Sequence, residues 1–139
     1  MRIVLDTGVV VAAMRSPTGA SAEIIRRVRA GYLVAVIGVG LALEYEAVCR
    51  RPEHQVASGL SSQDVERFVN AVLGIMEPVK NHFLWRPQLN DPGDELVLET
   101  AINGRAQLLV TFNEKDFAVA DRFGIEVLLP RETLKRVRQ

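Results

Sequence analysis

The stretch RIVLDTGVVVAA, residues 2–13, opens the chain with an apolar run that is interrupted by one carboxylate, Asp6. We interpret it as the first strand, and its start, RIVLD at 2–6, is typical of a central parallel strand buried on both faces. An ionised carboxylate inside such a run costs roughly several kcal/mol unless something pairs with it. Asp6 is therefore a helix cap, a salt-bridge partner or part of a functional site.

Apolar runs alternate with helical patterns along the rest of the chain. Further strands are expected at 32–37, 107–111 and 124–130, with a weaker one within 77–85. Helices are expected over about 22–31, 41–51, 61–73 and 92–103. The helix near 22 ends at Gly31, Pro52 stops the second helix, Ser61 begins the third with a capping-box pattern, and Gly104 ends the fourth. This alternation predicts right-handed βαβ units in one three-layer α/β/α domain over residues 1–139, with a mostly parallel central sheet.

Composition narrows the class of protein. The 139 residues hold 17 Lys and Arg against 17 Asp and Glu, which excludes a protein that coats nucleic acid by net charge alone. Cys49 is the only cysteine, so no intrachain disulfide forms, and its apolar setting predicts a buried thiol. The N-terminus lacks a signal-peptide pattern, and the apolar run 32–43 is too short to cross a bilayer. A cytoplasmic protein with no membrane partner is expected.

Polar residues follow two of the predicted strands at their carboxyl ends. Asp6 ends the first strand, and Thr111 ends the strand at 107–111, followed by Asn113 and Asp116. In parallel α/β sheets, ligands bind beyond the carboxyl ends of the strands. These side chains are therefore expected at the same edge of the sheet.

Two predicted helices add carboxylates to this edge. Asp94 falls on one face with Val97, Leu98 and Ala101, at the amino end of a helix that points toward the carboxyl ends of the strands. Glu44 lies on or beside the apolar face of the second helix. An all-oxygen cluster suits Mg²⁺ or Mn²⁺, which would assist phosphodiester hydrolysis.

Simpler interpretations remain open for each residue. Asp91 reads as the N-cap of the helix that starts at Pro92, and Asp94 can assist that cap. Glu44 is as well explained by pairing with an arginine, Asp116 by capping a helix that begins at Phe117, and Asn113 by a turn. The residues expected to be solvated or structural are Glu46, His54, His82 and Trp85. Glu95 is a secondary site candidate, with a solvated position as the alternative.

Four motifs resemble the PIN-domain family, in order and over nearly the whole chain. They are VLDTGVVVAAMRSPTGAS (4–21), LALEYEAVCRRP (41–52), DPGDELVLETA (91–101) and LLVTFNEKDF (108–117). Within the family the chain is most similar to the VapC-like toxins of bacterial toxin–antitoxin pairs. The resemblance implies a Mg²⁺- or Mn²⁺-dependent endoribonuclease that acts on RNA, is held in check by a cognate antitoxin and forms a homodimer.

The resemblance also assigns site residues by position. Asp6, Glu44, Asp94 and Asp116 would bind the metal directly or through water, and Thr111 and Asn113 would orient a carboxylate or a water. Apart from the resemblance, local arginines such as Arg15, or Arg50 and Arg51, are expected to steer the substrate phosphate, since the net charge supplies no steering. One position departs from the family, which commonly has Asn two residues after the first Asp, where this chain has Gly8.

Two other functions remain as alternatives. A receiver-like binding module would need a phospho-accepting Asp and a neighbouring Lys on the central strands, and this chain does not supply them. A catalytically weak or silent relative that binds RNA or a partner protein is compatible with Gly8.

Overall fold

A computed structural model describes residues 1–80 and 88–137. Its centre is a five-stranded sheet in the order β3-β2-β1-β4-β5, with every neighbouring pair parallel. The strands are β1 (Arg2–Leu5), β2 (Val34–Ile37), β3 (Glu77–Pro78), β4 (Leu108–Val110) and β5 (Glu126–Leu128). The predicted α/β class is confirmed, and the sheet is parallel throughout.

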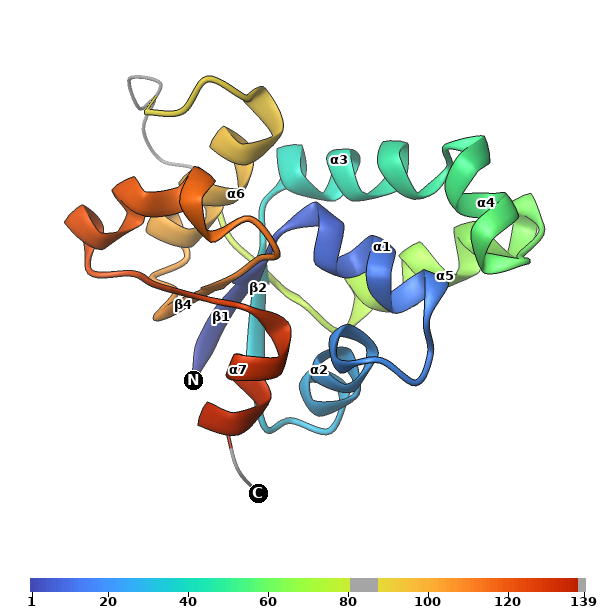
Figure 1. The fold of residues 1–139 in the computed structure, drawn as a ribbon, viewed down its shortest axis with the longest axis horizontal. Helices are drawn as coiled ribbons and strands as arrows, with labels where there is room; N and C mark the ends of the chain where they lie inside the picture. The colour runs from blue at the N-terminus through green and yellow to red at the C-terminus, as the bar shows by residue number, and fades with distance from the viewer. Residues whose placement is uncertain (81–87, 138–139) are drawn as a thin grey trace.

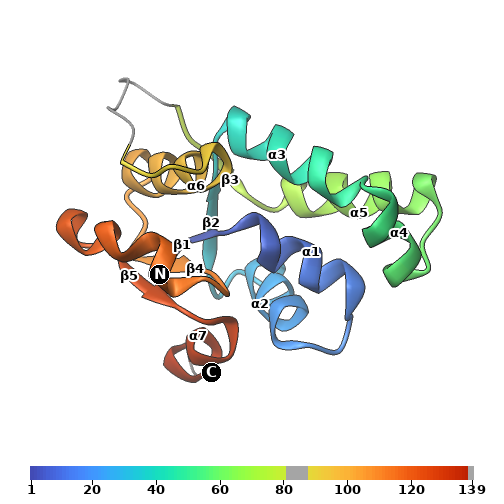
Figure 2. The ribbon, with the colours of Figure 1, turned by 45° about the horizontal axis from the view of Figure 1, so that its top comes forward.

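Helices lie on both sides of this sheet. They are α1 (Thr7–Arg15), α2 (Ala20–Arg29), α3 (Val39–Cys49), α4 (Pro52–Ser58), α5 (Ser62–Gly74), α6 (Pro92–Asn103), the 3₁₀ segment η1 (Glu114–Phe123) and α7 (Pro130–Arg136). Figure 2 shows α6 and η1 above the sheet and α2 and α7 below it, while α3, α4 and α5 extend to one side. No described helix is both long and apolar enough to cross a membrane.

The central strands are short and are buried on both faces. Ile3, Val4 and Leu5 in β1 are fully buried, as are Leu109 and Val110 in β4. Continuous apolar runs of this kind are what a sheet covered by helices on both faces requires. The predicted strands at 2–6, 32–37 and 107–111 match this core to within two residues at each end.

The interpretation of residues 2–13 as one strand is wrong beyond Leu5. The chain leaves the sheet at Asp6, and Thr7–Arg15 form α1. Its valines are β-branched and favour strands in isolation, yet Val9 and Val10 are fully buried in the helical conformation. Packing of this face against the core overrides the weak intrinsic preference.

Prolines begin helices here as well as ending them. Pro52 follows α3, as predicted, but it also occupies the first turn of α4, and Pro130 does the same for α7. A fixed φ and a missing N–H fit the first helical turn, where that N–H has no intrahelical partner. Neither α4 nor α7 was predicted. The predicted caps of α5 and α6 are confirmed, since Ser61 and Asp91 each accept a backbone hydrogen bond three residues on.

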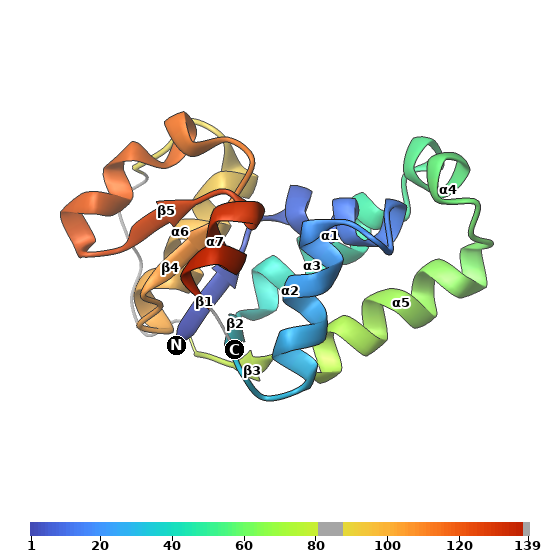
Figure 3. The ribbon, with the colours of Figure 1, turned by 60° about the horizontal axis from the view of Figure 1, so that its bottom comes forward.

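The strand order fixes where the chain reverses direction across the sheet. From β1 it proceeds to β2 and β3 on one side, then crosses to β4 and β5 on the other. The reversal point therefore lies between β1 and β4, the position where open α/β sheets bind ligands. Figure 1 shows α1, α3 and α6 each beginning beyond the carboxyl ends of the strands. Figure 3 shows the layers from below.

Candidate active site

Asp6 lies at the point where β1 ends and α1 begins. It occupies the N-cap position of α1, but its side chain makes no capping hydrogen bond. The residue is 7% exposed and forms none of the ion pairs found among the described residues. Burial raises the pKa of its carboxyl, while hydrogen bonds from Thr111 and the Thr7 backbone oppose the rise. Among the described residues, Asp6 therefore has neither of the two simpler roles, a side-chain helix cap or an ion pair.

Thr111 ties Asp6 to the neighbouring strand. Its hydroxyl donates to Asp6 Oδ2 at 2.7 Å and accepts from the backbone N–H of Asn113 at 3.0 Å. The backbone N–H of Asp6 in turn donates to Val110 at 2.9 Å. The ends of β1 and β4 are thus joined through side chain and backbone, which fixes the direction of the buried carboxylate. Asn113 contributes its backbone here, and its side chain is exposed.

Asp94 enters from the first turn of α6. Its backbone N–H donates to Asp91 Oδ1 at 3.0 Å, which confirms Asp91 as the cap and frees the Asp94 carboxylate for other contacts. Partial burial, followed by the charges of Asp91, Asp6, Asp116 and Glu44, raises the pKa of the Asp94 carboxyl to about 6. The predicted set, Asp6, Glu44, Asp94 and Asp116, comes from four different segments, and the fold brings the other three within electrostatic range of Asp94.

Glu44 reaches this group because two glycines let helices approach closely. A Cβ at Gly93 would lie 3.2 Å from Glu44 Oε1 and 3.1 Å from Asp91 Oδ1, so both carboxylates face the first turn of α6. A Cβ at Gly40 would lie 2.7 Å from Leu96 Cδ2, so any side chain there would force the end of the Leu96 side chain to shift. The predicted alternative for Glu44, pairing with an arginine, is not seen among the described residues.

Tyr45 is a positioning residue that the sequence reasoning missed. It is fully buried in α3, and its hydroxyl donates to the backbone carbonyl of Leu5, immediately before Asp6. Burial, with the nearby charge of Asp6, raises the pKa of its hydroxyl well above the ordinary value. Tyr45 therefore holds α3 against the end of β1 and sets the place of Glu44. A tyrosine in the centre of an apolar helix face, next to a candidate glutamate, was the available signal.

We refer to Asp6, Glu44, Asp91, Asp94 and Asp116 as the acidic cluster. Asp91 belongs to it because its charge raises the pKa of both Asp6 and Asp94, although the sequence indicated a cap alone. Asp116 is exposed in the first turn of η1, which begins at Glu114 rather than at the predicted Phe117. Within residues 1–80 and 88–137, no member of the acidic cluster forms an ion pair with Lys, Arg or His.

The donor set bears on whether a divalent ion fits. An all-oxygen group of mutually repelling carboxylates matches the ligand preference of Mg²⁺ and Mn²⁺. Yet no three His, Cys, Asp or Glu side chains in the described part of the chain are arranged so that they could hold an ion. The residues therefore fit an ion with one or two direct carboxylate ligands and several retained waters, a common arrangement for Mg²⁺, and do not fit a cage of three.

Other candidate residues have structural roles. Glu95 accepts backbone hydrogen bonds from Gln88 and Leu89 (2.9 Å to Leu89), so it orders the entry to α6 instead of being solvated. Glu46 pairs with Arg50 at 3.5 Å on the surface. His54 in α4 has a buried Nδ1 without a hydrogen-bond partner among the described residues. His82 and Trp85 lie outside the described residues.

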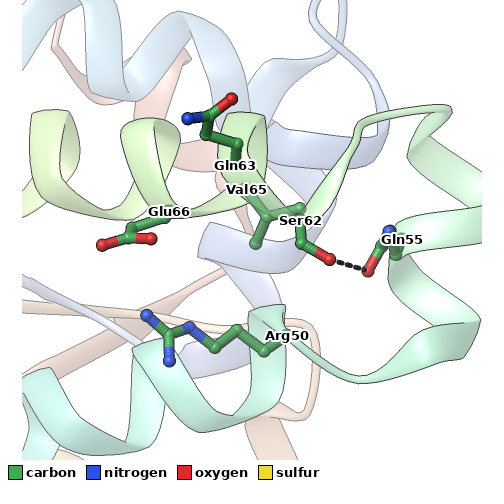
Figure 4. A pocket seen from close by; sticks show the side chains of 6 residues that line it. All are labelled: Arg50, Gln55, Ser62, Gln63, Val65 and Glu66. Carbon is green, nitrogen blue, oxygen red and sulfur yellow. Dashed lines mark hydrogen bonds between the residues drawn. The ribbon is translucent and has the colours of Figure 1, made fainter.

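The arginines proposed for phosphate steering lie away from the acidic cluster. Arg15 ends α1, roughly 13 Å along that helix from Asp6. Arg50 and Arg51 follow the far end of α3. Figure 4 shows Arg50 at a cavity of about 530 Å³ where Ser62 donates to Gln55 at 3.3 Å, and no member of the acidic cluster lines it. The cavity is lined by Arg50, Gln55, Ser62, Gln63, Val65 and Glu66.

The comparisons with known proteins agree with this geometry. The family model of the PIN domain matches residues 2–115, which include every member of the acidic cluster except Asp116. No curated protein and no solved structure gives a significant match. A family match over this share of the chain, together with a parallel sheet that carries carboxylates at its reversal point, shows that the chain belongs to the PIN-domain family, which has a nuclease-type fold.

Proposed function

We propose that this protein is a cytoplasmic, Mg²⁺- or Mn²⁺-dependent endoribonuclease and the toxin of a toxin–antitoxin pair. The observation that supports it most directly is the acidic cluster: carboxylates from four segments meet at the reversal point of the sheet without a cationic partner among the described residues. Repulsion of this kind is relieved by a bound cation or by protonation. A divalent cation that also binds a phosphodiester would satisfy both the site and the substrate.

Each residue of the site would have a distinct role. Asp6 and Asp94 would ligate an ion, while Glu44 and Asp116 would accept hydrogen bonds from waters that the ion retains. Thr111 holds Asp6 in place through its hydroxyl, and Asn113 fixes that hydroxyl through its backbone N–H. When bound, the ion would supply Lewis acidity toward the phosphoryl group and lower the pKa of the attacking water.

The direct test is RNA cleavage in Mn²⁺ by wild type, Asp6→Asn and Asp94→Asn. Asp121→Asn, an exposed carboxylate on η1 outside the acidic cluster, is the matched control. We expect wild type and Asp121→Asn to cleave and to stop in EDTA, and both cluster variants to be inactive. Equal, EDTA-insensitive cleavage by all four proteins would refute the proposal, because the activity would then be independent of the site.

A catalytically silent relative that binds RNA or a partner is the second candidate. Gly8 and the lack of a three-carboxylate group among the described residues favour it. Titration of metal-free protein with millimolar Mg²⁺ separates the two. A heat of binding that Asp6→Asn abolishes supports the enzyme, and no binding at the acidic cluster supports the silent protein.

An antitoxin and a homodimer complete the proposal. Exposed apolar side chains of α3, Val39 at 78% and Leu43 at 62%, lie on the helix that carries Glu44 and are available to a protein partner. Light scattering on the purified chain, alone and after co-expression with the product of an adjacent gene, measures both associations. A monomer that captures no small partner would remove the toxin assignment while leaving the nuclease assignment intact.

A further inference from the structure

A second cavity lies at the exit of β4, next to Thr111, and the proposed mechanism does not use it. It has a volume of about 310 Å³ and is lined by Ala20, Phe112, Leu129, Pro130 and Arg131. These residues come from the start of α2, the exit of β4 and the turn between β5 and α7. We call this cavity the Phe112 pocket.

Phe112 connects the Phe112 pocket to the acidic cluster. It stands between Thr111, whose hydroxyl binds Asp6, and Asn113, whose backbone N–H binds Thr111. Its side chain is 51% exposed, whereas Phe117, five residues on, is fully buried in the core. The ring of Phe112 is therefore held at the edge of the site with one side available to a ligand.

The opposite wall of the Phe112 pocket is built rigidly. The backbone N–H of Leu129 donates to Glu132 at 3.1 Å, and the N–H of Thr133 donates to the carbonyl of Leu129 at 2.9 Å. Pro130 is buried and has a fixed φ. A preformed wall opposite an exposed ring costs little ordering entropy when a flat ligand enters.

Charge decides which ligand suits the Phe112 pocket. Arg131 is exposed at its rim and takes part in no ion pair of the described residues. An apolar slot with an aromatic ring and a guanidinium matches a nucleotide, because the base stacks on the ring and the phosphate meets the cation. A purely apolar protein segment would leave this cation without a counter-charge.

We propose that the Phe112 pocket binds one unpaired nucleobase of an RNA strand whose phosphodiester lies at the acidic cluster. Phe112 stacks on the base, and Arg131 contacts a phosphate next to it. The inference rests on the proposed function for the identity of the substrate as RNA. It adds a base-binding site for that substrate, which takes an unpaired base because a base held in a duplex cannot enter the pocket.

The experiment measures binding of a short single-stranded oligoribonucleotide in Mg²⁺, within times too short for measurable cleavage, so that a cation can neutralise the acidic cluster. A 2-aminopurine placed along the strand reports stacking through quenching of its fluorescence. The variants are Phe112→Leu, which keeps the apolar volume but removes the ring, and Phe112→Trp, which keeps a ring. Tyr32→Leu is the matched control, because Tyr32 is 57% exposed but precedes β2, at the opposite end of the sheet.

We expect Phe112→Leu to weaken binding by about tenfold or more and to abolish the quenching, since one stacked base contributes about that much. Phe112→Trp should retain both, and Tyr32→Leu should match wild type. An abasic nucleotide at the quenched position should make wild type and Phe112→Leu equal. Arg131→Gln should reduce the slope of log affinity against log salt by about 0.7, the loss of one phosphate contact.

The outcomes separate this inference from the proposed function. If wild type binds and cleaves RNA and Phe112→Leu does both equally well, the Phe112 pocket is not a base site. If RNA binds through Phe112 and is never cleaved in Mn²⁺, the base site stands and the nuclease proposal fails. If Phe112→Leu disrupts self-association or a protein complex while RNA affinity is unchanged, the Phe112 pocket is a protein contact and the inference is wrong.

Discussion

Carboxylates occur in two contrasting environments in this molecule. On the surface, three glutamates each accept a hydrogen bond from an arginine, and this bond lowers the pKa of the glutamate. The pairs are Glu23 with Arg26, Glu77 with Arg2, and Glu126 with Arg136. The Arg136–Glu126 pair is bidentate, with both distances at 2.7 Å. At the acidic cluster, burial and neighbouring anions raise the pKa of Asp6 and Asp94 instead.

The contrast shows that the lack of a basic partner for the acidic cluster among the described residues does not reflect a shortage of basic residues. The chain has as many basic as acidic residues, and several described arginines, among them Arg2 and Arg136, pair with acids elsewhere on the surface. An unneutralised group of carboxylates lowers the stability of the metal-free fold, and function is the usual reason for retaining such groups. Each prediction below alters one side of this contrast.

The largest effect is expected from Asp94→Asn. RNA cleavage should fall by about a hundredfold or more, because a lost metal ligand removes several kcal/mol of transition-state stabilisation. At pH 7.5 the metal-free variant should nevertheless melt at a higher temperature than wild type, since one anion has left the acidic cluster. Thermal denaturation with and without Mg²⁺ checks both parts. Wild type alone should be stabilised by the ion, by about 2.7 kcal/mol at a hundred times the dissociation constant.

Thr111→Val should have the next largest effect. It removes the hydroxyl that donates to Asp6 and accepts from Asn113, at nearly constant volume. Leaving a buried carboxylate without this donor should lower the free energy of unfolding by about 1–3 kcal/mol, and cleavage should fall about tenfold as Asp6 loses its orientation. Urea denaturation and initial cleavage rates measure the two effects. Thr111→Ser is the control and should retain most of both.

Gly8→Asn should raise activity. Gly8 is exposed in the first turn of α1, and a Cβ there would meet nothing within 4 Å. An amide that hydrogen-bonds in the site contributes about 1 kcal/mol, or about fivefold in rate. Gly8→Ala gains more helix propensity than Gly8→Asn and lacks the amide, so it should be more stable than wild type and no more active. Equal activity of the two variants would mean that the departure at Gly8 is not what limits this chain.

The pH dependence of stability isolates Asp94. Its folded-state pKa is about 6, raised from 3.8, so the folded chain holds the proton more tightly than the unfolded chain does. This favourable contribution is complete below about pH 4 and is lost as pH rises toward 6 and slightly above. The difference in unfolding free energy between metal-free wild type and Asp94→Asn should therefore shift against wild type across that window. Urea titrations at intervals of half a pH unit measure it, and a flat difference would contradict the raised pKa.

The smallest effect is expected from breaking a surface ion pair. Glu126→Gln breaks a pair whose partners are each nearly half exposed, and such pairs contribute little because water screens them. Cleavage and the Mg²⁺ response should be unchanged, and the melting temperature should move little. A loss of activity as large as that of Asp94→Asn would show that charge in general, and not the acidic cluster, governs function.

Sequence patterns predicted some of these features better than others. The strands of the core, the caps Ser61 and Asp91, and the convergence of Asp6, Glu44 and Asp94 follow from local composition and from the rule that parallel strands end at one edge. The α1 helix was missed because its valines favour strands locally, and packing decided otherwise. The roles of Tyr45 and Gly93 depend on contacts between residues far apart in the chain, which no local pattern contains.

By itself the sequence determined the class of fold, the family and which acids face one edge of the sheet, because these depend on periodicity, turn chemistry and residue type. The tertiary structure alone decided which acids share an electrostatic environment, that the Thr111 hydroxyl hydrogen-bonds Asp6, and that Phe112 stays exposed next to Thr111. The physical reason is that desolvation and charge repulsion depend on distances across the fold, and strand order and helix packing set those distances.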